Sequence, residues 1–278
     1  MSFSPSLLLA IALLASHPNH LETRSYIIGF TAYAEGDYEL AIDIWEQLAH
    51  RGDAESQYAM GVLYELGHGT ERDYRRAATW YQRAAAQGYA MARNNLGMLY
   101  ESGLGVPQDF ALALANYEHA ARQGLPSAQY NLALMHYQGL GIGQNYATAS
   151  EWMQKAAEQG FASAQYNLGI MYQRGEGVPQ NNVAAAHWYI EAAKWGAPRA
   201  ESSLRMLLQD KRRIATSKVA TVREAPNDAA SELAKLQPGD HVYTLEQRGS
   251  WIAVVLEDGR TLGWIEGETL TSKIQTAN

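Results

Sequence analysis

Cysteine is absent from this 278-residue chain, and its absence excludes several kinds of chemistry. Disulfide bonds, thiol nucleophiles and cysteine-ligated metal sites cannot form. Basic charge is also scarce, because 22 Lys and Arg stand against 29 Asp and Glu, for a formal net charge of −7. Bulk nucleic acid and anionic lipid both require a basic face, so neither is an expected partner. The one basic run, 211–213, is expected at the solvated end of a helix, where cations complement the helix dipole.

Long hydrophobic runs are missing as well. The apolar stretch from Ser6 to Ala15 is too short to span a bilayer, so no stable membrane span is expected. The stretch fits the apolar core of a signal peptide over residues 1–20, although no Lys or Arg precedes it. A buried or frayed N-terminal helix is the alternative. The first interpretation predicts a periplasmic or secreted protein, and the second is compatible with the cytoplasm.

The usual catalytic motifs do not occur. H-E-x-x-H, G-x-S-x-G, S-x-x-K and the phosphate-binding G-x-x-x-x-G-K are all absent. The eight His residues are scattered, and none has a partner at metal-ligand spacing. The sequence therefore predicts no catalytic residue, no metal site and no cofactor, and it favours a protein that is not an enzyme.

Repetition with a period of 36 residues is what the chain does have. Glycine recurs in four columns, and alanine replaces it once, at Ala133. The columns are Gly61, Gly97, Ala133 and Gly169; Gly67, Gly103, Gly139 and Gly175; Gly69, Gly105, Gly141 and Gly177; and Gly88, Gly124, Gly160 and Gly196. So many columns in register indicate a repeat architecture.

Each unit predicts two helices joined by a loop, as residues 90–125 illustrate. Gly97 lies inside the first helix despite its cost there, which suggests that the second helix packs too close for a Cβ. Asp109 is placed to cap the second helix, and Gly124 to end it. One hairpin cannot bury both of its faces, so neighbouring units must stack. The aromatic column at 80–81, 116–117, 152–153 and 188–189 is expected to interlock adjacent units, with ligand stacking as the alternative.

Two segments flank the four regular units. Residues 21–53 form a shorter leading unit, because the distance from Gly29 to Ala41 is four residues less than the corresponding distance in the next unit. The missing residues are those of the glycine-rich loop. After the last unit, residues 198–213 have the apolar spacing of one further amphipathic helix, which is polar enough to cap the stack.

The motifs LG-x-x-Y, G-x-G-V, A-x-x-W-Y and AA-x-x-G identify a resemblance. The units 54–89, 90–125, 126–161 and 162–197 resemble the Sel-1-like repeat, a relative of the tetratricopeptide repeat, and residues 21–53 look like a tetratricopeptide-type unit. This resemblance implies an all-α solenoid, an α-α superhelix. The unit 126–161 departs most, with Ala133, His136 and Asn145 in place of Gly, Tyr and Asp. Some secreted relatives are described as weakly β-lactamase-like, but these carry a disulfide in each repeat, so a hydrolase is only a remote alternative here.

The pattern changes after residue 213. Short apolar alternations at 218–223, 241–246, 251–256 and 261–265 are separated by turn signals and predict strands. Within the C-terminal segment 214–278, residues from about 217 to 272 resemble a bacterial Src-homology-3-like domain, which implies a small all-β barrel. The resemblance is carried by motifs such as Leu236-x-Pro238-Gly239-Asp240 and Gly263-Trp264-Ile265. Relatives of that kind bind peptidoglycan or peptides. Trp251 and Trp264 are therefore candidates for a ligand face, with packing inside the barrel as the alternative.

The leading functional hypothesis is a non-catalytic scaffold whose helical groove binds a peptide or a partner protein. By analogy with tetratricopeptide repeats, the fifth and twelfth positions of each first helix would face the partner. These positions are Tyr58, Asn94, Tyr130 and Tyr166, and Glu65, Glu101, Tyr137 and Gln173. Such an aromatic, mildly acidic groove would favour a segment with apolar and basic side chains. The alternative is a peptidoglycan-binding adaptor or a regulator of cell-wall remodelling, acting through the C-terminal barrel.

Overall fold

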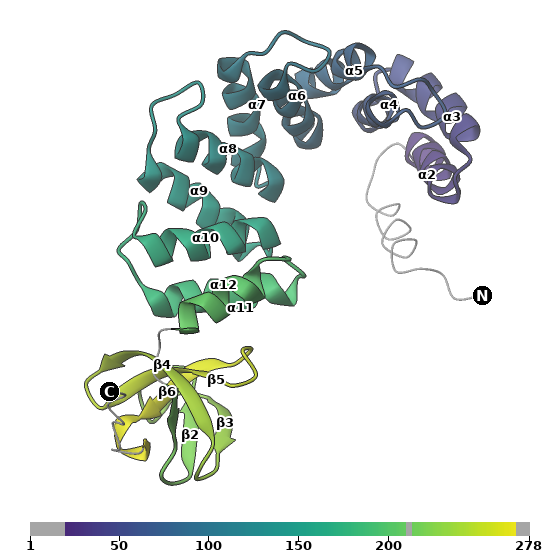
Figure 1. Ribbon diagram of the computed structural model, residues 1–278. Coiled ribbons are helices and arrows are strands. Elements are labelled where there is room, and N and C mark those ends of the chain that lie inside the picture. The colour runs from purple at the N-terminus through teal and green to yellow at the C-terminus, as the bar shows by residue number, and fades with distance from the viewer. Residues whose placement is uncertain (1–19, 210–212, 271–278) are drawn as a thin grey trace, which may run out of the picture. The chain divides into compact units, whose positions relative to one another are not determined.

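The computed structural model describes residues 20–209 and 213–270 (Figure 1). The expected signal peptide lies outside the described residues, apart from His20 at its end. The described part of the chain divides into two compact units, one that runs up to residue 135 and includes 140–142, and one that comprises 136–139 and the described residues from 143 onward. No helix in the described ranges is both long enough and apolar enough to cross a membrane.

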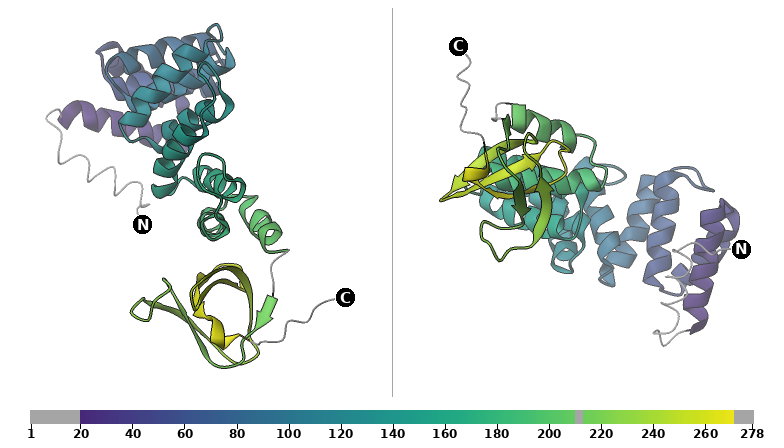
Figure 2. Two further views of the ribbon diagram at one scale, coloured as in Figure 1. Left: turned by 90° about the vertical axis from the view of Figure 1, so that its left-hand side faces the viewer. Right: turned by 90° about the horizontal axis from the view of Figure 1, so that it is seen from below.

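The first unit is built from consecutive helices that pack side by side (Figures 1 and 2). They are α2 (His20–Glu35), α3 (Tyr38–His50), α4 (Ala54–Leu66), α5 (Tyr74–Ala86), α6 (Ala90–Ser102), α7 (Phe110–Arg122) and most of α8 (Pro126–Gln138). The second unit continues with α9 (Tyr146–Glu158), α10 (Ala162–Arg174), α11 (Asn182–Lys194) and α12 (Ala200–Gln209). The predicted α-α solenoid of helix pairs is therefore confirmed.

The repeat columns have the local roles that the sequence assigned to them. Asp109 caps α7 by accepting a hydrogen bond from the backbone N–H of Leu112, at 2.9 Å. Gly124 has a φ of +92°, which only glycine adopts without strain. The ring of Trp80 is 8% exposed and belongs to the apolar cluster of the preceding helix pair, which includes Trp45. At this position the predicted interlock between neighbouring units is confirmed.

The glycine that recurs inside the first helix of three of the four repeats is explained by a tyrosine ring. A Cβ at Gly97 would lie 2.8 Å from Cε1 of Tyr117, a side chain of α7. Gly61 and Gly169 face the rings of Tyr81 and Tyr189 in the same way. The sequence anticipated a close approach of the second helix, and the structure identifies a side chain of that helix as the group that needs the space.

The loops between the paired helices link one repeat to the one before it. A Cβ at Gly105 would collide with the backbone carbonyl carbon of Tyr74, the first residue of α5. Gly141 and Gly177 lie against the backbone of the first residue of α7 and α9 in the same manner, and Gly69 lies against the Cβ of Tyr38, the first residue of α3. The second glycine of each loop is thus a contact between repeats.

The helix predicted over 198–213 is shorter than expected. Helix α12 buries Ala200, Leu204 and Leu208 as the apolar spacing indicated, but within the described residues it ends at Gln209. Arg213 begins a strand instead, because its backbone pairs with Tyr243 in a β-ladder. The prediction that the basic run 211–213 lies at the end of a helix is therefore wrong for Arg213, which lies in a strand. Residues 211 and 212 lie outside the described ranges.

A six-stranded antiparallel sheet follows α12, in the order β1-β4-β5-β6-β2-β3. The strands are β1 (Arg213–Ala215), β2 (Ala220–Arg223), β3 (Glu232–Leu236), β4 (His241–Arg248), β5 (Trp251–Leu256) and β6 (Leu262–Glu266). The four predicted strands correspond to β2, β4, β5 and β6. Strands β1 and β3, which are the two outer strands of the sheet, were not predicted from the sequence.

Candidate partner-binding face

The fifth-position residues lie on the first helices of successive repeats. Tyr58, Asn94 and Tyr130 belong to α4, α6 and α8 of the first unit, and Tyr166 belongs to α10 of the second. The three tyrosines are half-buried, whereas Asn94 is only 6% exposed. We call Tyr58, Asn94 and Tyr130 the inner column.

Polar contacts connect the inner column to its neighbours in the first unit. The side-chain amide of Asn131 on α8 donates a hydrogen bond to Oδ1 of Asn94 on α6, at 3.0 Å. Next to Tyr58, the side-chain amide of Asn95 donates to the hydroxyl of Tyr81 at 3.1 Å, and the Tyr81 ring packs against that of Tyr58. Sequence reasoning missed Asn95 and Asn131, although asparagine recurs at this position in three of the four repeats (95, 131 and 167) and that recurrence was a usable signal.

Aromatic rings flank the same face at α4. The ring centroid of Tyr58 lies 5.3 Å from that of Tyr89 and 5.7 Å from that of Tyr81. Burial, together with the charge of Glu65, raises the pKa of Tyr58. The Tyr58 hydroxyl therefore stays protonated at neutral pH and can donate a hydrogen bond.

The twelfth-position residues hold the helix pairs together. The Tyr117 hydroxyl donates to Oε2 of Glu101 at 2.6 Å, and the Tyr189 hydroxyl donates to Oε1 of Gln173 at 2.6 Å. Tyr81 donates to Glu65 in the same way. Burial raises the pKa of Tyr117, and its hydrogen bond to Glu101 raises it further. At least one side-chain oxygen of each of these partners is engaged inside its own repeat.

The repeat 126–161 breaks this pattern. Tyr137 stands in the twelfth position, and Met153 stands where the other repeats have the buried tyrosine. The Tyr137 hydroxyl instead donates to Oε2 of Glu176, at 2.7 Å. This repeat thus lacks both the tyrosine hydroxyl that donates in the other repeats and the Glu or Gln oxygen that accepts. Because both are missing, neither is left buried without a hydrogen-bond partner.

The two tryptophans proposed for the sheet differ in accessibility. Trp251 begins β5 and is half-buried, whereas Trp264 on β6 is 7% exposed. The guanidinium of Arg248 lies 5.1 Å from the centre of the Trp264 ring. Trp251 is thus the more accessible of the two as a ligand platform.

The described residues contain no candidate metal site. Within 20–209 and 213–270, no group of three or more His, Asp or Glu is placed to hold a metal ion. The polar contacts of the candidate face join phenol, amide and carboxylate groups, which are suited to hydrogen bonding with a partner.

Comparison with known proteins gives one matching family. The model described as Sel1 repeat matches residues 54–89, 90–125, 126–161 and 162–194. Its last match ends three residues before the predicted boundary at 197. No curated protein matches the chain.

Two solved structures are similar over most of this chain. A Sel1 repeat protein from Oxalobacter formigenes is 32% identical with a TM-score of 0.60, and the match covers 66% of this chain and 74% of that one. A protective antigen present in uropathogenic Escherichia coli strains, described as displaying an SLR fold, is 31% identical with a TM-score of 0.62. That match covers 75% of this chain and 44% of the antigen, so this chain spans less than half of the antigen's length.

Proposed function

Because the chain belongs to the Sel1 repeat family, we propose that it is a non-catalytic scaffold whose first helices bind a peptide or a partner protein in the bacterial cell envelope. The observation that supports this most is the inner column. It places phenol and amide groups on three successive first helices of one unit, while Glu65 and Glu101 hold the helix pairs together. The envelope location rests on the apolar segment from Ser6 to Ala15.

The chemistry of the inner column suits an extended peptide. Tyrosine combines a large apolar ring with a hydroxyl donor, which makes it a frequent anchor in protein interfaces. Asparagine amides offer both donors and acceptors to the main chain of a bound segment. The second oxygens of Glu65 and Glu101 add negative charge, so apolar and basic side chains are favoured in the partner.

The test begins with a photo-crosslinking residue at Ser127, on the first turn of α8, to identify a partner of the full chain. Affinity for that partner is then measured by calorimetry for the wild type and for Y58A/Y130A. We expect the variant to bind at least about tenfold more weakly, because truncated aromatic anchors usually dominate such interfaces.

The matched control is L112A/H119A, which alters two exposed residues of the second helix α7. It should bind as the wild type does. Unchanged affinity of Y58A/Y130A, with the fold verified by circular dichroism, contradicts the proposed face. Turnover of a β-lactam by the metal-free protein would instead favour the remote hydrolase alternative.

A second candidate function concerns the sheet, which we infer to be a Src-homology-3-like barrel that tethers the chain to peptidoglycan. The half-buried Trp251 supports it, because an accessible indole ring is a suitable platform for an amphipathic ligand. Purified sacculi should retain the full chain and release W251A. Equal retention of both proteins, or of neither, contradicts the tether.

N-terminal sequencing of the native protein tests the location, since export predicts a start near residue 21.

A further inference from the structure

The exposed side of helix α5, together with the loop directly before it, carries an unusual concentration of arginine. Arg72, Arg75, Arg76 and Arg83 lie within residues 72–83, and all four are exposed. Helix α5 itself contains no Asp or Glu. The preceding second helix, α3, carries Glu39, Asp43 and Glu46 instead. Within a chain of net charge −7, this is a local patch of positive charge. We call these four residues the arginine face.

Aromatic rings hold three of the four guanidinium groups in place. Arg72 lies 5.6 Å from the centre of the Tyr74 ring, Arg76 lies 5.4 Å from that of Tyr64, and Arg83 lies 4.4 Å from that of Trp80. Such cation–π contacts restrict long, flexible side chains. A restricted side chain loses less entropy when a ligand binds, so the arginine face is partly pre-organised.

A shallow hollow that is open to solvent lies between Arg72 and Arg75. It has a volume of about 370 Å³ and is lined by these two residues with Asp73, Tyr74 and Gly105. Gly105 comes from the loop of the next repeat, and it sits directly on the Tyr74 carbonyl because it has no Cβ. The contact between repeats therefore builds one wall of the hollow.

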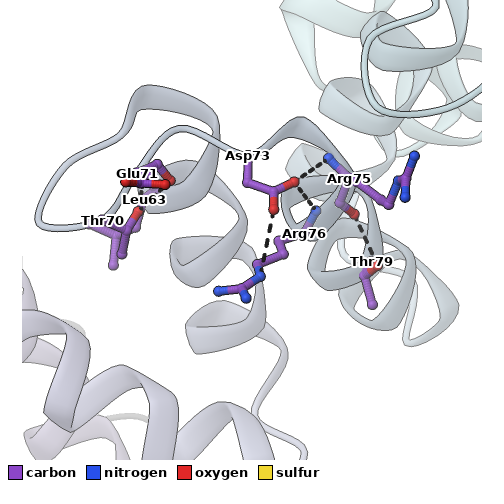
Figure 3. Close-up of polar contacts among 7 residues, drawn as sticks. All are labelled: Leu63, Thr70, Glu71, Asp73, Arg75, Arg76 and Thr79. Atoms are coloured by element: carbon purple, nitrogen blue, oxygen red, sulfur yellow. Dashed lines mark hydrogen bonds and ion pairs between the residues drawn. The ribbon is translucent and has the colours of Figure 1, made fainter.

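The carboxylate in this hollow is already engaged. Asp73 accepts hydrogen bonds from the backbone N–H groups of Arg75 and Arg76, at 2.9 and 3.0 Å (Figure 3). Its other oxygen lies 3.6 Å from Nε of Arg76. Across the described residues, no carboxylate lies within ion-pair distance of the Arg72 or Arg75 guanidinium groups. These two cations remain available to a ligand.

We propose that the arginine face binds an acidic segment of a partner protein, with a Glu or Asp carboxylate between Arg72 and Arg75. A guanidinium donates two parallel hydrogen bonds to a carboxylate, which gives both strength and geometry. The flanking Glu71 and Asp73 carboxylates and the net charge of −7 repel any anion, and they repel the dense, continuous charge of a phosphate backbone more than a few separated carboxylates. A protein segment with separated carboxylates therefore fits better than a nucleic acid. This site lies on a second helix, apart from the proposed function of the first helices.

The test uses the full chain and a short fluorescein-labelled peptide of alternating Glu and Ser, with the Gln and Ser version as the neutral probe. Fluorescence anisotropy at physiological salt should show binding of the acidic probe alone. R72Q/R75Q should weaken it by about tenfold or more, because charge-assisted hydrogen bonds to an arginine pair are lost. A thermal melt by circular dichroism verifies that the variant is folded.

The control R51Q/R122Q removes two exposed arginines elsewhere in the first unit, so its net charge changes by the same amount as that of R72Q/R75Q. It should retain wild-type affinity for the acidic probe. An equal loss in both variants would mean that general charge drives binding, and this overturns the proposal. So does tighter binding of a single-stranded oligonucleotide of the same charge, or no preference of the wild type for the acidic probe. Y58A/Y130A should bind this probe normally, which separates the arginine face from the inner column.

Discussion

At the scale of single residues, a group of a glycine, a tyrosine and a glutamate or glutamine recurs in three of the four repeats. In residues 90–125, Gly97 leaves room for the ring of Tyr117, and Glu101 accepts a hydrogen bond from its hydroxyl. The repeat 126–161 differs at all three columns, with Ala133, Tyr137 and Met153. A change at one column therefore coincides with changes at the other two, as expected for groups that compete for the same buried space.

This grouping predicts a rescue. G97A should destabilise the protein by about 1–3 kcal/mol, because its methyl group would collide with the Tyr117 ring. Adding Y117M should recover much of that loss, since an unbranched methionine adapts to irregular space. Urea denaturation of the two single variants and the double variant measures the coupling. The pairing would be refuted by strictly additive effects.

Sequence reasoning at this scale was accurate for backbone roles and incomplete for side-chain contacts. The cap at Asp109 and the φ of Gly124 follow from local rules, and both were predicted. The hydrogen bond from Tyr117 to Glu101 joins residues 16 positions apart on two helices. The 36-residue spacing shows that both positions recur, but it does not show that the tyrosine hydroxyl donates to the carboxylate. For this reason, the only contact predicted for Glu101 was one with a bound partner.

At the scale of elements, the loop between paired helices is the part that joins repeats. Gly103 and Gly105 have the same φ of +71°, so an alanine pays a similar backbone penalty at either position. Their surroundings differ. A Cβ at Gly103 would approach the side chain of Gln108 within its own loop, at 3.3 Å, whereas a Cβ at Gly105 would collide with the Tyr74 backbone of the preceding repeat.

We therefore expect G105A to destabilise the protein by at least about 1 kcal/mol more than G103A, because backbone cannot move aside as a side chain can. Urea denaturation followed by circular dichroism measures the difference, with G103A as the matched control for the positive φ. Equal losses in the two variants would show that the contact with Tyr74 contributes nothing to stability.

The strands missed by the sequence are also an element-scale result. Strand β3 runs Glu-Leu-Ala-Lys-Leu, and only its last residue is buried. An outer strand has a partner on one side alone, so it needs little of the apolar alternation by which strands are recognised. Strand β1 has three residues and follows the expected helix directly. Both strands are defined by pairing with β2 and β4 rather than by their own composition.

At the scale of the whole chain, the helices of the second unit and its sheet share one apolar cluster. Leu204 and Leu208 of α12 belong to it, together with Ile190 of α11 and Val255 of β5. Tyr243 of β4 packs against it while half-buried. The sequence alone does not show whether the repeats and the sheet are coupled, but the shared cluster predicts that they unfold together.

L204A should therefore weaken both parts. Removing this buried side chain should cost about 2–5 kcal/mol. Hydrogen exchange followed by mass spectrometry should show faster exchange in α11 and also in β5, by similar factors. Faster exchange confined to α11 and α12 would show that the sheet is energetically independent. V219A, at an exposed position just before β2, is the control and should leave both parts unchanged.

The contact made by the second loop glycine has a consequence for how such a chain changes length. Each repeat rests its loop on the first residue of the second helix of the preceding repeat, and each repeat of residues 54–161 offers the same surface to the repeat that follows. A tandem duplication of one whole repeat would thus inherit a compatible neighbour on both sides. Evolution can lengthen or shorten the array in steps of a whole unit without inventing a new interface, whereas a partial duplication would leave an unmatched surface.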